Sequence, residues 1–227
     1  MSSKYLLCID ASVQTASVAL SNEDGLLGIK ICEQQREHAA FIQPAIQDLL
    51  KEQTIQPSNI TAVAVTSGPG SYTGLRVAMA SAKGLCYALQ IPLITINTLE
   101  LMSIVALQQT KIDNNDLLCP LIDARRMEVF TAVYTSSLQI VAVPQAMILN
   151  EDSFQEFLSS SCTHFFGNGA EKWKSICSHM NAKFANVSWN ASHMTKKAWD
   201  LYQTEQFASL AYATPFYGKD FYSTSKL

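Results

Sequence analysis

Residues 60–100 hold the feature that most constrains the fold, a loop rich in glycine and hydroxyl residues between a strand pattern and a helix pattern. The apolar run at 60–65 predicts a buried strand of a mostly parallel sheet. The loop at 66–74 (TSGPGSYTG) follows, a helix pattern continues to Leu89, and a second apolar strand is predicted at 92–96. These elements predict a strand–helix–strand unit whose loop lies at the carboxyl end of a strand, where open α/β sheets place ligands.

The helix predicted after this loop has two distinct faces. Apolar residues at helical spacing predict a face that covers the sheet: Leu75, Met79, Ala82, Cys86 and Leu89. The opposite face carries mostly small side chains: Val77, Ala80, Ser81, Gly84 and Ala88. Small side chains allow another helix to approach closely, and that helix could belong to this chain or to a partner. Arg76 and Lys83 are seven residues apart and share one edge of the helix.

The first half of the chain reads as βββαβαβα. Strands are predicted at 5–9, 16–20 and 26–32, with a hairpin turn at 22–25, and helices at about 38–51, 74–89 and 98–109. Pro44 lies inside the first of these helices, so we expect a kink or a late helix start there.

The second half begins with an echo of the first. A polar stretch at 111–116 (KIDNND) predicts a boundary between domains 1–110 and 111–227. The segment 117–124 (LLCPLIDA) then resembles 6–11 (LLCIDA). Strands at 129–134, 139–143, 163–166 and 184–187 and helices at 152–158, 170–179 and 195–203 follow by pattern. The sequence therefore predicts a duplicated α/β fold.

Composition narrows the class of protein. Of 227 residues, 48% are hydrophobic and 15% are charged, so the chain can bury a substantial core. The formal net charge of −3 argues against an unaided grip on a nucleic acid backbone. The six cysteines form no CxxC pair, and neither a membrane-spanning run nor a signal-peptide layout is present, so we expect reduced thiols and a cytoplasmic location.

One acidic residue ends the first strand of each half. Asp10 and Asp123 could orient a metal-bound phosphate or a water across a cleft, with Ser12 and Thr15 as hydrogen-bond partners. Aspartate also caps turns, and both interpretations remain open.

Other motifs offer no self-sufficient catalytic site. The loop residues Gly68, Gly70 and Ser71 could present backbone N–H groups to an anion, but they match neither a P-loop nor GxGxxG. The four histidines show no HxxxH or HExxH spacing, so a histidine-based metal site is not expected. No GxSxG elbow or recognisable cysteine nucleophile occurs.

The segment 67–85 (SGPGSYTGLRVAMASAKGL) resembles the signature of the TsaB (YeaZ) family, the partner subunit in bacterial tRNA threonylcarbamoyladenosine synthesis. Supporting matches are the IDAS turn at 9–12, the Arg-Glu-His run at 36–38, Pro44, IDARRMEVF at 122–130 and Pro-Phe-Tyr at 215–217.

This resemblance implies an actin-like/Hsp70/sugar-kinase (ASKHA) fold with two ribonuclease H-like halves around a cleft. It also implies a non-catalytic relative of the catalytic subunit TsaD, because Thr98 and Met102 stand where TsaD carries an HxxxH metal motif. Asp10, Ser12, Gly68, Gly70 and Ser71 would be remnants of a nucleotide site. No cofactor is then required by this chain, while ATP or ADP and Mg²⁺ would act at the level of the complex.

The resemblance further implies a heterodimer with TsaD through the first two helices. The expected interface residues are His38, Phe41, Ala45, Arg76, Val77, Ala80, Ser81, Lys83, Gly84 and Ala88. TsaE and TsaC would act in the same pathway, tRNA would be met through the complex, and a homodimer would form when the partner is absent. The rival interpretations are a stand-alone actin-like ATPase or kinase, and a peptidase.

Overall fold

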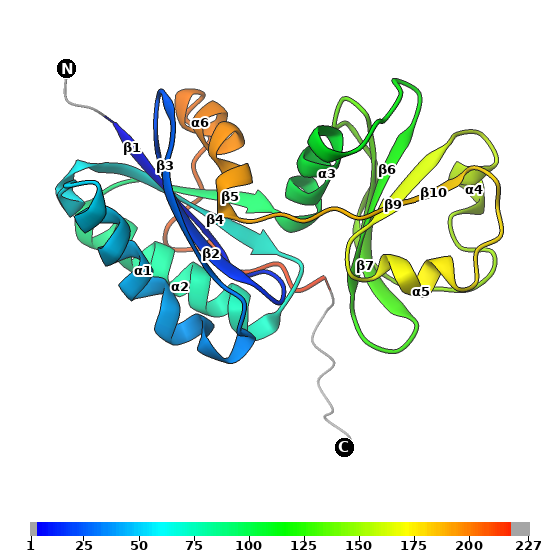
Figure 1. The fold of residues 1–227 in the computed structure, drawn as a ribbon, viewed down its shortest axis with the longest axis horizontal. Coiled ribbons are helices and arrows are strands. Elements are labelled where there is room, and N and C mark those ends of the chain that lie inside the picture. The colour runs from blue at the N-terminus through cyan, green and yellow to red at the C-terminus, as the bar shows by residue number, and fades with distance from the viewer. Residues whose placement is uncertain (1–3, 219–227) are drawn as a thin grey trace.

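Two five-stranded sheets with the same topology make up the computed structural model, which describes residues 4–218 (Figure 1). The first sheet has the order β3-β2-β1-β4-β5. Its strands are β1 (Tyr5–Asp10), β2 (Ala16–Asn22), β3 (Gly25–Cys32), β4 (Ile60–Gly68) and β5 (Leu93–Asn97). The second sheet has the order β10-β9-β6-β7-β8. Its strands are β6 (Leu117–Asp123), β7 (Glu128–Thr135), β8 (Ile140–Ile148), β9 (Thr163–Phe166) and β10 (Ala182–Ala185).

The pairing of the strands repeats as well as their order. In each sheet the first strand pairs antiparallel with the second and parallel with the fourth. In each case an apolar first strand therefore lies in the middle of its sheet, where both faces are covered. The predicted duplicated actin-like fold is confirmed.

The helices lie in layers around the two sheets. They are α1 (His38–Glu52), α2 (Tyr72–Leu89), α3 (Thr98–Gln109), α4 (Gln155–Leu158), α5 (Ala170–Lys174) and α6 (Thr195–Gln203). Figure 1 shows α1 and α2 on one side of the first sheet, α6 on the other, and α3 between the two sheets. One core cluster runs from the first sheet through α3 into the second sheet, so the two halves share apolar packing. Within residues 4–218, none of these helices combines the length and the apolar character needed to cross a membrane.

Several element boundaries differ from the prediction. Helix α1 begins at His38, directly after a 3₁₀ turn, so Pro44 lies inside it; of the two predicted effects, a kink or a late start, the late start is wrong. Strand β8 extends to Ile148, beyond the predicted 139–143. Helices α4 and α5 are shorter than predicted. Before α4, the Asn150 side chain accepts a hydrogen bond from the Asp152 amide, and Phe154 has a positive φ of 61°, so the helix cannot begin earlier.

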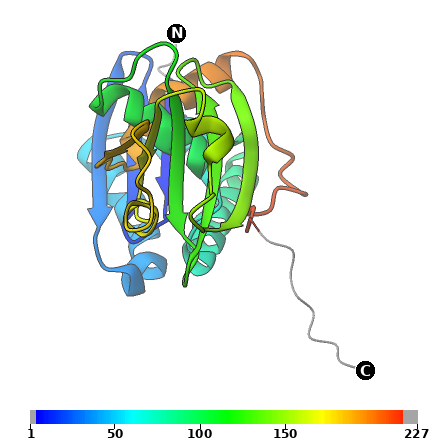
Figure 2. The same cartoon turned by 90° about the vertical axis from the view of Figure 1, so that its right-hand side faces the viewer.

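The last described segment, residues 204–218 after α6, returns to the first sheet, and we call it the return segment. Helix α6 packs against β1 and β5. Beyond it, the Ala208 amide donates to the Leu93 carbonyl at 2.8 Å, and the Phe216 amide donates to the Ser67 carbonyl at 2.7 Å. Figure 2 shows this return segment, orange to red, descending along one side of the molecule. The predicted boundary at 110/111 thus falls between the two sheets, while Ala191, Ala208 and Phe216 bond back to the first half.

Candidate functional site

The glycine-rich loop packs tightly against the β1–β2 turn. The Ser71 amide donates a hydrogen bond of 2.6 Å to the Ser12 carbonyl oxygen. A Cβ atom added at Gly70 would stand 2.0 Å from that same oxygen, and one at Gly74 would stand 2.0 Å from the Ala11 carbonyl oxygen. Glycine is therefore needed at both positions because backbone lies against backbone there.

The other side of the loop is covered by the return segment. Gly68 has a φ of 105°, and a Cβ atom there would stand 2.2 Å from the Phe216 carbonyl oxygen. Ser71 Oγ caps α2 by accepting a hydrogen bond of 3.3 Å from the Gly74 amide. Packing and capping thus account for Gly68, Gly70 and Ser71, three of the residues that the sequence assigned to a remnant nucleotide site.

Asp10 is buried beneath this loop. The residue is only 1% exposed. Its Oδ1 atom accepts hydrogen bonds from the Ser12 amide at 3.0 Å and from Thr66 Oγ1 at 2.7 Å. Burial raises the pKa of the Asp10 carboxyl, and the hydrogen bonds from Ser12 and Thr66 offset this only in part. Its Oδ2 atom finds no hydrogen-bond partner within residues 4–218. The carboxyl group is therefore held inside the protein.

His38 lies close to Asp10 from the start of α1. Its Nε2 is 3.1 Å from the Gln14 carbonyl oxygen, which calls for a proton on that nitrogen. Burial lowers the pKa of the His38 imidazole, while the Gln14 carbonyl and the charge of Asp10 act in the opposite direction. His38 thus joins α1 to the β1–β2 turn through the Gln14 carbonyl. His38 is only 3% exposed, so its ring contributes to the interior.

Asp123, the counterpart of Asp10 in the second half, has different surroundings. Its side chain is 39% exposed and lies 2.7 Å from Lys172 Nζ, and its Oδ1 accepts a hydrogen bond from the Arg125 amide. Partial burial acts to raise the pKa of the Asp123 carboxyl, but the hydrogen bonds and charges of Lys172 and Arg125 outweigh it and lower the pKa. The two acids thus occupy equivalent places in the fold but differ in exposure and in the direction in which the protein shifts their pKa.

A cleft lies between the two halves, as predicted. One part, of about 630 Å³, is lined by residues of the β1–β2 turn, the glycine loop and the β6–β7 turn, among them Ser12, Ser71 and Asp123. A neighbouring part, of about 680 Å³, is lined by residues 13–15, by Gly167 and Asn168, and by residues 184–189. Asp10 lines neither part. The cleft therefore does not receive the pair of facing carboxylates that a metal-bound phosphate would need.

The positions that match the metal motif of the catalytic relative are in the core. Thr98 and Met102 lie on α3 and are both 0% exposed. Met102 Cε lies so near Gly167 that an added Cβ there would stand 2.4 Å from it. Neither a threonine nor a buried methionine thioether is a usual ligand of a catalytic divalent cation.

Helix α2 presents an open surface of small side chains. Leu75, Met79, Ala82 and Cys86 are buried against the sheet, as predicted. On the other face Arg76, Ala80, Gly84 and Ala88 are exposed, and Val77 and Ser81 are half-buried. A Cβ atom at Gly84 would meet no atom within 4 Å. Tyr87, which the sequence pattern did not single out, is also on α2 and is 73% exposed. We call Arg76, Val77, Ala80, Ser81, Gly84, Tyr87 and Ala88 the α2 strip.

Three predicted interface residues lie elsewhere. His38 and Ala45, on α1, are 3% and 4% exposed, so the chain itself covers them. Lys83 Nζ donates to the carbonyl oxygens of Ala211 at 3.3 Å and Ala213 at 3.0 Å, and so holds the return segment. Phe41 is half-buried and packs against the core. The candidate contact surface is therefore narrower than the sequence predicted.

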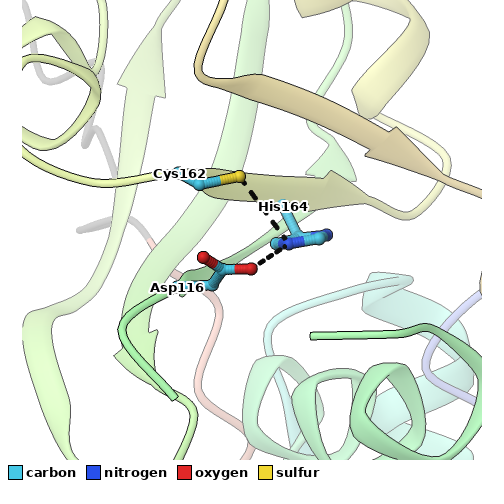
Figure 3. Close-up of side chains that lie close together, drawn as sticks. All are labelled: Asp116, Cys162 and His164. Atoms are coloured by element: carbon cyan, nitrogen blue, oxygen red, sulfur yellow. Dashed lines mark hydrogen bonds and ion pairs between the residues drawn. The ribbon is translucent and has the colours of Figure 1, made fainter. Parts of the chain in front are cut away.

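Sequence reasoning missed one cluster of side chains altogether. Asp116, Cys162 and His164 meet where β6 and β9 begin, and their ligand atoms all lie within 4.8 Å of one another (Figure 3). The Cys-x-His spacing was the only local signal. Asp116 is 46 residues away from Cys162 in the sequence, and only the parallel pairing of the two strands brings it close.

The fold and the cleft define an actin-like protein of two duplicated halves. A family model described as "TsaD: tRNA N6-adenosine threonylcarbamoyltransferase" matches residues 11–211. The chain belongs to this family, and its resemblance to TsaB (YeaZ) proteins is confirmed by the relatives below.

Curated relatives include two proteins named "tRNA threonylcarbamoyladenosine biosynthesis protein TsaB". The one from Bacillus subtilis is 34% identical and the one from Escherichia coli 35% identical, each over 129 residues, 57% of this chain and 54% of the relative. A tRNA N6-adenosine threonylcarbamoyltransferase from Streptococcus mutans is 39% identical over 113 residues, 43% of this chain and 34% of the relative. The matches to the two TsaB proteins thus span about half of their length.

Solved structures agree on the fold. A Pseudomonas aeruginosa protein described as similar to peptidase YeaZ superposes with a TM-score of 0.78 at 23% identity, over 96% of this chain and 100% of that one. The structure described as YeaZ from the same organism gives a TM-score of 0.75 at 22% identity, over the same shares.

Proposed function

We propose that this chain is a non-catalytic subunit that pairs with a TsaD-type transferase in the synthesis of threonylcarbamoyladenosine on tRNA. The names of the TsaB and TsaD relatives support the pathway. The observation that carries the subunit role is the α2 strip, where an exposed surface of small side chains adjoins an exposed tyrosine. The groups that would perform chemistry are instead buried or packed, as Asp10 and the glycine loop are.

The α2 strip suits a helix of a partner chain. Helices that pack through small residues bring their axes to about 8–10 Å, and the open space at Gly84 leaves room for a side chain of the partner. Tyr87 adds a large amphipathic side chain of the kind that dominates interface energies. In the absence of the partner, the same strip would pair with a second copy of this chain.

As a non-catalytic subunit, this chain would need no cofactor. ATP or ADP and Mg²⁺ would be used by the complex, with TsaC and TsaE acting in the same pathway. Because the formal net charge is −3, the tRNA backbone would be held mainly by other subunits. The six free cysteines are consistent with work in the reducing cytoplasm.

Reconstitution tests this proposal. The cognate TsaD, TsaC and TsaE are combined with tRNA, ATP, threonine and bicarbonate, with and without this chain, and modified adenosine is measured. Modification should depend on the chain and should be lost with Gly84→Trp, whose indole would fill the α2 strip. Gln108→Trp, at an exposed position of α3, is the matched control and should remain active. Equal modification without the chain would overturn the proposal, as would rapid ATP turnover by the isolated chain.

A further inference from the structure

We propose that Asp116, Cys162 and His164 form a binding site for a thiophilic divalent cation, with zinc as the best chemical match. The three residues carry a carboxylate, a thiol and an imidazole, which are the three side-chain groups that bind zinc in proteins. The site lies in the second half, away from the α2 strip, and is independent of the pairing proposed above.

Strand pairing fixes the positions of the three residues. His164 lies opposite Leu118 in the parallel register of β9 and β6, and the Leu117 amide donates to the Cys162 carbonyl at 2.9 Å. Cys162 and His164 are two residues apart, so their side chains leave the same face of the strand. Asp116 immediately precedes β6 and points toward them (Figure 3).

The distances are close to those of a coordination sphere. His164 Nε2 is 2.8 Å from Asp116 Oδ2 and 3.9 Å from Cys162 Sγ. Zinc bonds of about 2.0–2.3 Å in a tetrahedron place neighbouring ligand atoms roughly 3.2–3.8 Å apart. Small side-chain shifts would therefore admit the ion, and a water would complete the tetrahedron.

The shared nitrogen distinguishes a metal site from a catalytic triad. In a cysteine–histidine–aspartate triad, one ring nitrogen faces the nucleophile and the other faces the carboxylate. Here the thiol and the carboxylate both lie at Nε2, so the ring cannot pass a proton from one to the other. Three donor atoms that converge on one point are what a metal ion needs.

Burial and charge also suit a divalent cation. The side chains of His164 and Asp116 are 9% and 13% exposed, and Cys162 is half-buried, so water competes weakly but an ion can still enter. On binding, the ion would displace the thiol proton of Cys162, and the resulting thiolate and the Asp116 carboxylate would supply two negative charges.

The position suggests a structural task. Asp116 ends the 110–116 connection between the two halves, and its Oδ2 also accepts a hydrogen bond of 3.1 Å from the Asp113 amide. The cleft lies at the opposite, carboxyl end of β6, about 20 Å away for a seven-residue strand. A bound ion would therefore fasten this connection to β9 and take no direct part in chemistry at the cleft.

Cobalt titration of the whole chain tests the site. Metal-free, reduced protein is titrated with Co²⁺, whose bond to a thiolate gives a charge-transfer band, and Zn²⁺ is then added as competitor. We expect one equivalent of Co²⁺, displaced by Zn²⁺, with a band that is lost in Cys162→Ser and an affinity lowered at least tenfold in Asp116→Asn. Cys177→Ser, another half-buried free cysteine, is the matched control and should bind normally.

Thermal unfolding gives a second readout. Zn²⁺ should raise the unfolding midpoint of the wild type and of Cys177→Ser, but not that of Cys162→Ser or Asp116→Asn. Circular dichroism of each variant before titration shows that it has folded. A wild-type chain with no stoichiometric thiolate band, or a band that persists in Cys162→Ser, would overturn the proposal.

Discussion

The Ser12 carbonyl oxygen lies where a side chain at Gly70 would begin, 2.0 Å from the position of its Cβ atom. The same oxygen accepts the Ser71 amide hydrogen bond at 2.6 Å. The glycine-rich loop thus connects β4 to α2 and packs against the β1–β2 turn. Its glycines are explained by backbone packing alone, which is why a glycine-rich loop does not by itself indicate a bound phosphate.

Gly70→Ala should destabilise the chain by about 3 kcal/mol, since the new methyl group meets backbone and the φ of 157° is unfavourable for alanine. Urea unfolding of the isolated chain measures the loss. Gly84→Ala is the matched control: its methyl group meets nothing within 4 Å, and alanine in a helix should stabilise by roughly 0.5–1 kcal/mol. Equal effects of the two substitutions would contradict the packing role of Gly70.

Asp10→Asn should stabilise the chain at neutral pH. The raised pKa of Asp10 means that the folded state binds a proton more tightly than the unfolded state, whose pKa is near 3.8. Stability is therefore lost as pH rises above 3.8 toward the folded pKa. Asparagine keeps the acceptor for Ser12 and Thr66 without a buried charge, and a gain of about 1 kcal/mol is expected at pH 7.

The control for this pH dependence is Asp123→Asn, which should act in the opposite direction. The pKa of Asp123 is lowered, so its contribution to stability is present above about pH 4 and is lost as pH falls through the folded pKa. Unfolding midpoints between pH 3 and 8 compare the two variants with the wild type. A loss of stability at pH 7 in Asp10→Asn would show that the carboxylate is ionised and paired in the folded chain.

Tyr87→Ala should weaken pairing with the cognate TsaD about tenfold or more, because exposed aromatic residues at interfaces commonly contribute 1–2 kcal/mol or more. Calorimetry or surface binding with purified partner measures the affinity. Met180→Ala, at a position 83% exposed in the second half, is the control and should bind as the wild type does. Unchanged affinity in Tyr87→Ala would place the contact outside the α2 strip.

Local patterns predicted most of the fold and only part of the site. The echo between 6–11 and 117–124 predicted the duplication because each buried strand and its turn are encoded within a few residues. The burial of His38 and Ala45 was not predicted, since α1 packs on the sheet and on α2 at once and so buries a wider face. The Asp116 cluster depends on pairing between strands far apart in sequence, which no local pattern contains.

The path of the return segment could not be predicted from local sequence patterns either. Residues 204–218 show no helical or strand periodicity, and single hydrogen bonds to Leu93 and Ser67 fix their path. Lys83 supports this path from α2. Sequence spacing placed Lys83 and Arg76 on one helix edge, but it did not predict their different partners, since Arg76 donates to the Tyr72 hydroxyl instead.

Lys83→Met should loosen the return segment and leave pairing intact. Methionine keeps the apolar stem of the side chain but cannot donate to the Ala211 and Ala213 carbonyls, so the segment should lose about 1 kcal/mol of local stability. Amide exchange at Phe216 should then quicken about fivefold, while exchange at Val63, inside β4, stays unchanged. Affinity for the TsaD partner should remain within twofold. A large loss of affinity for TsaD without faster exchange at Phe216 would instead show that Lys83 contacts the partner.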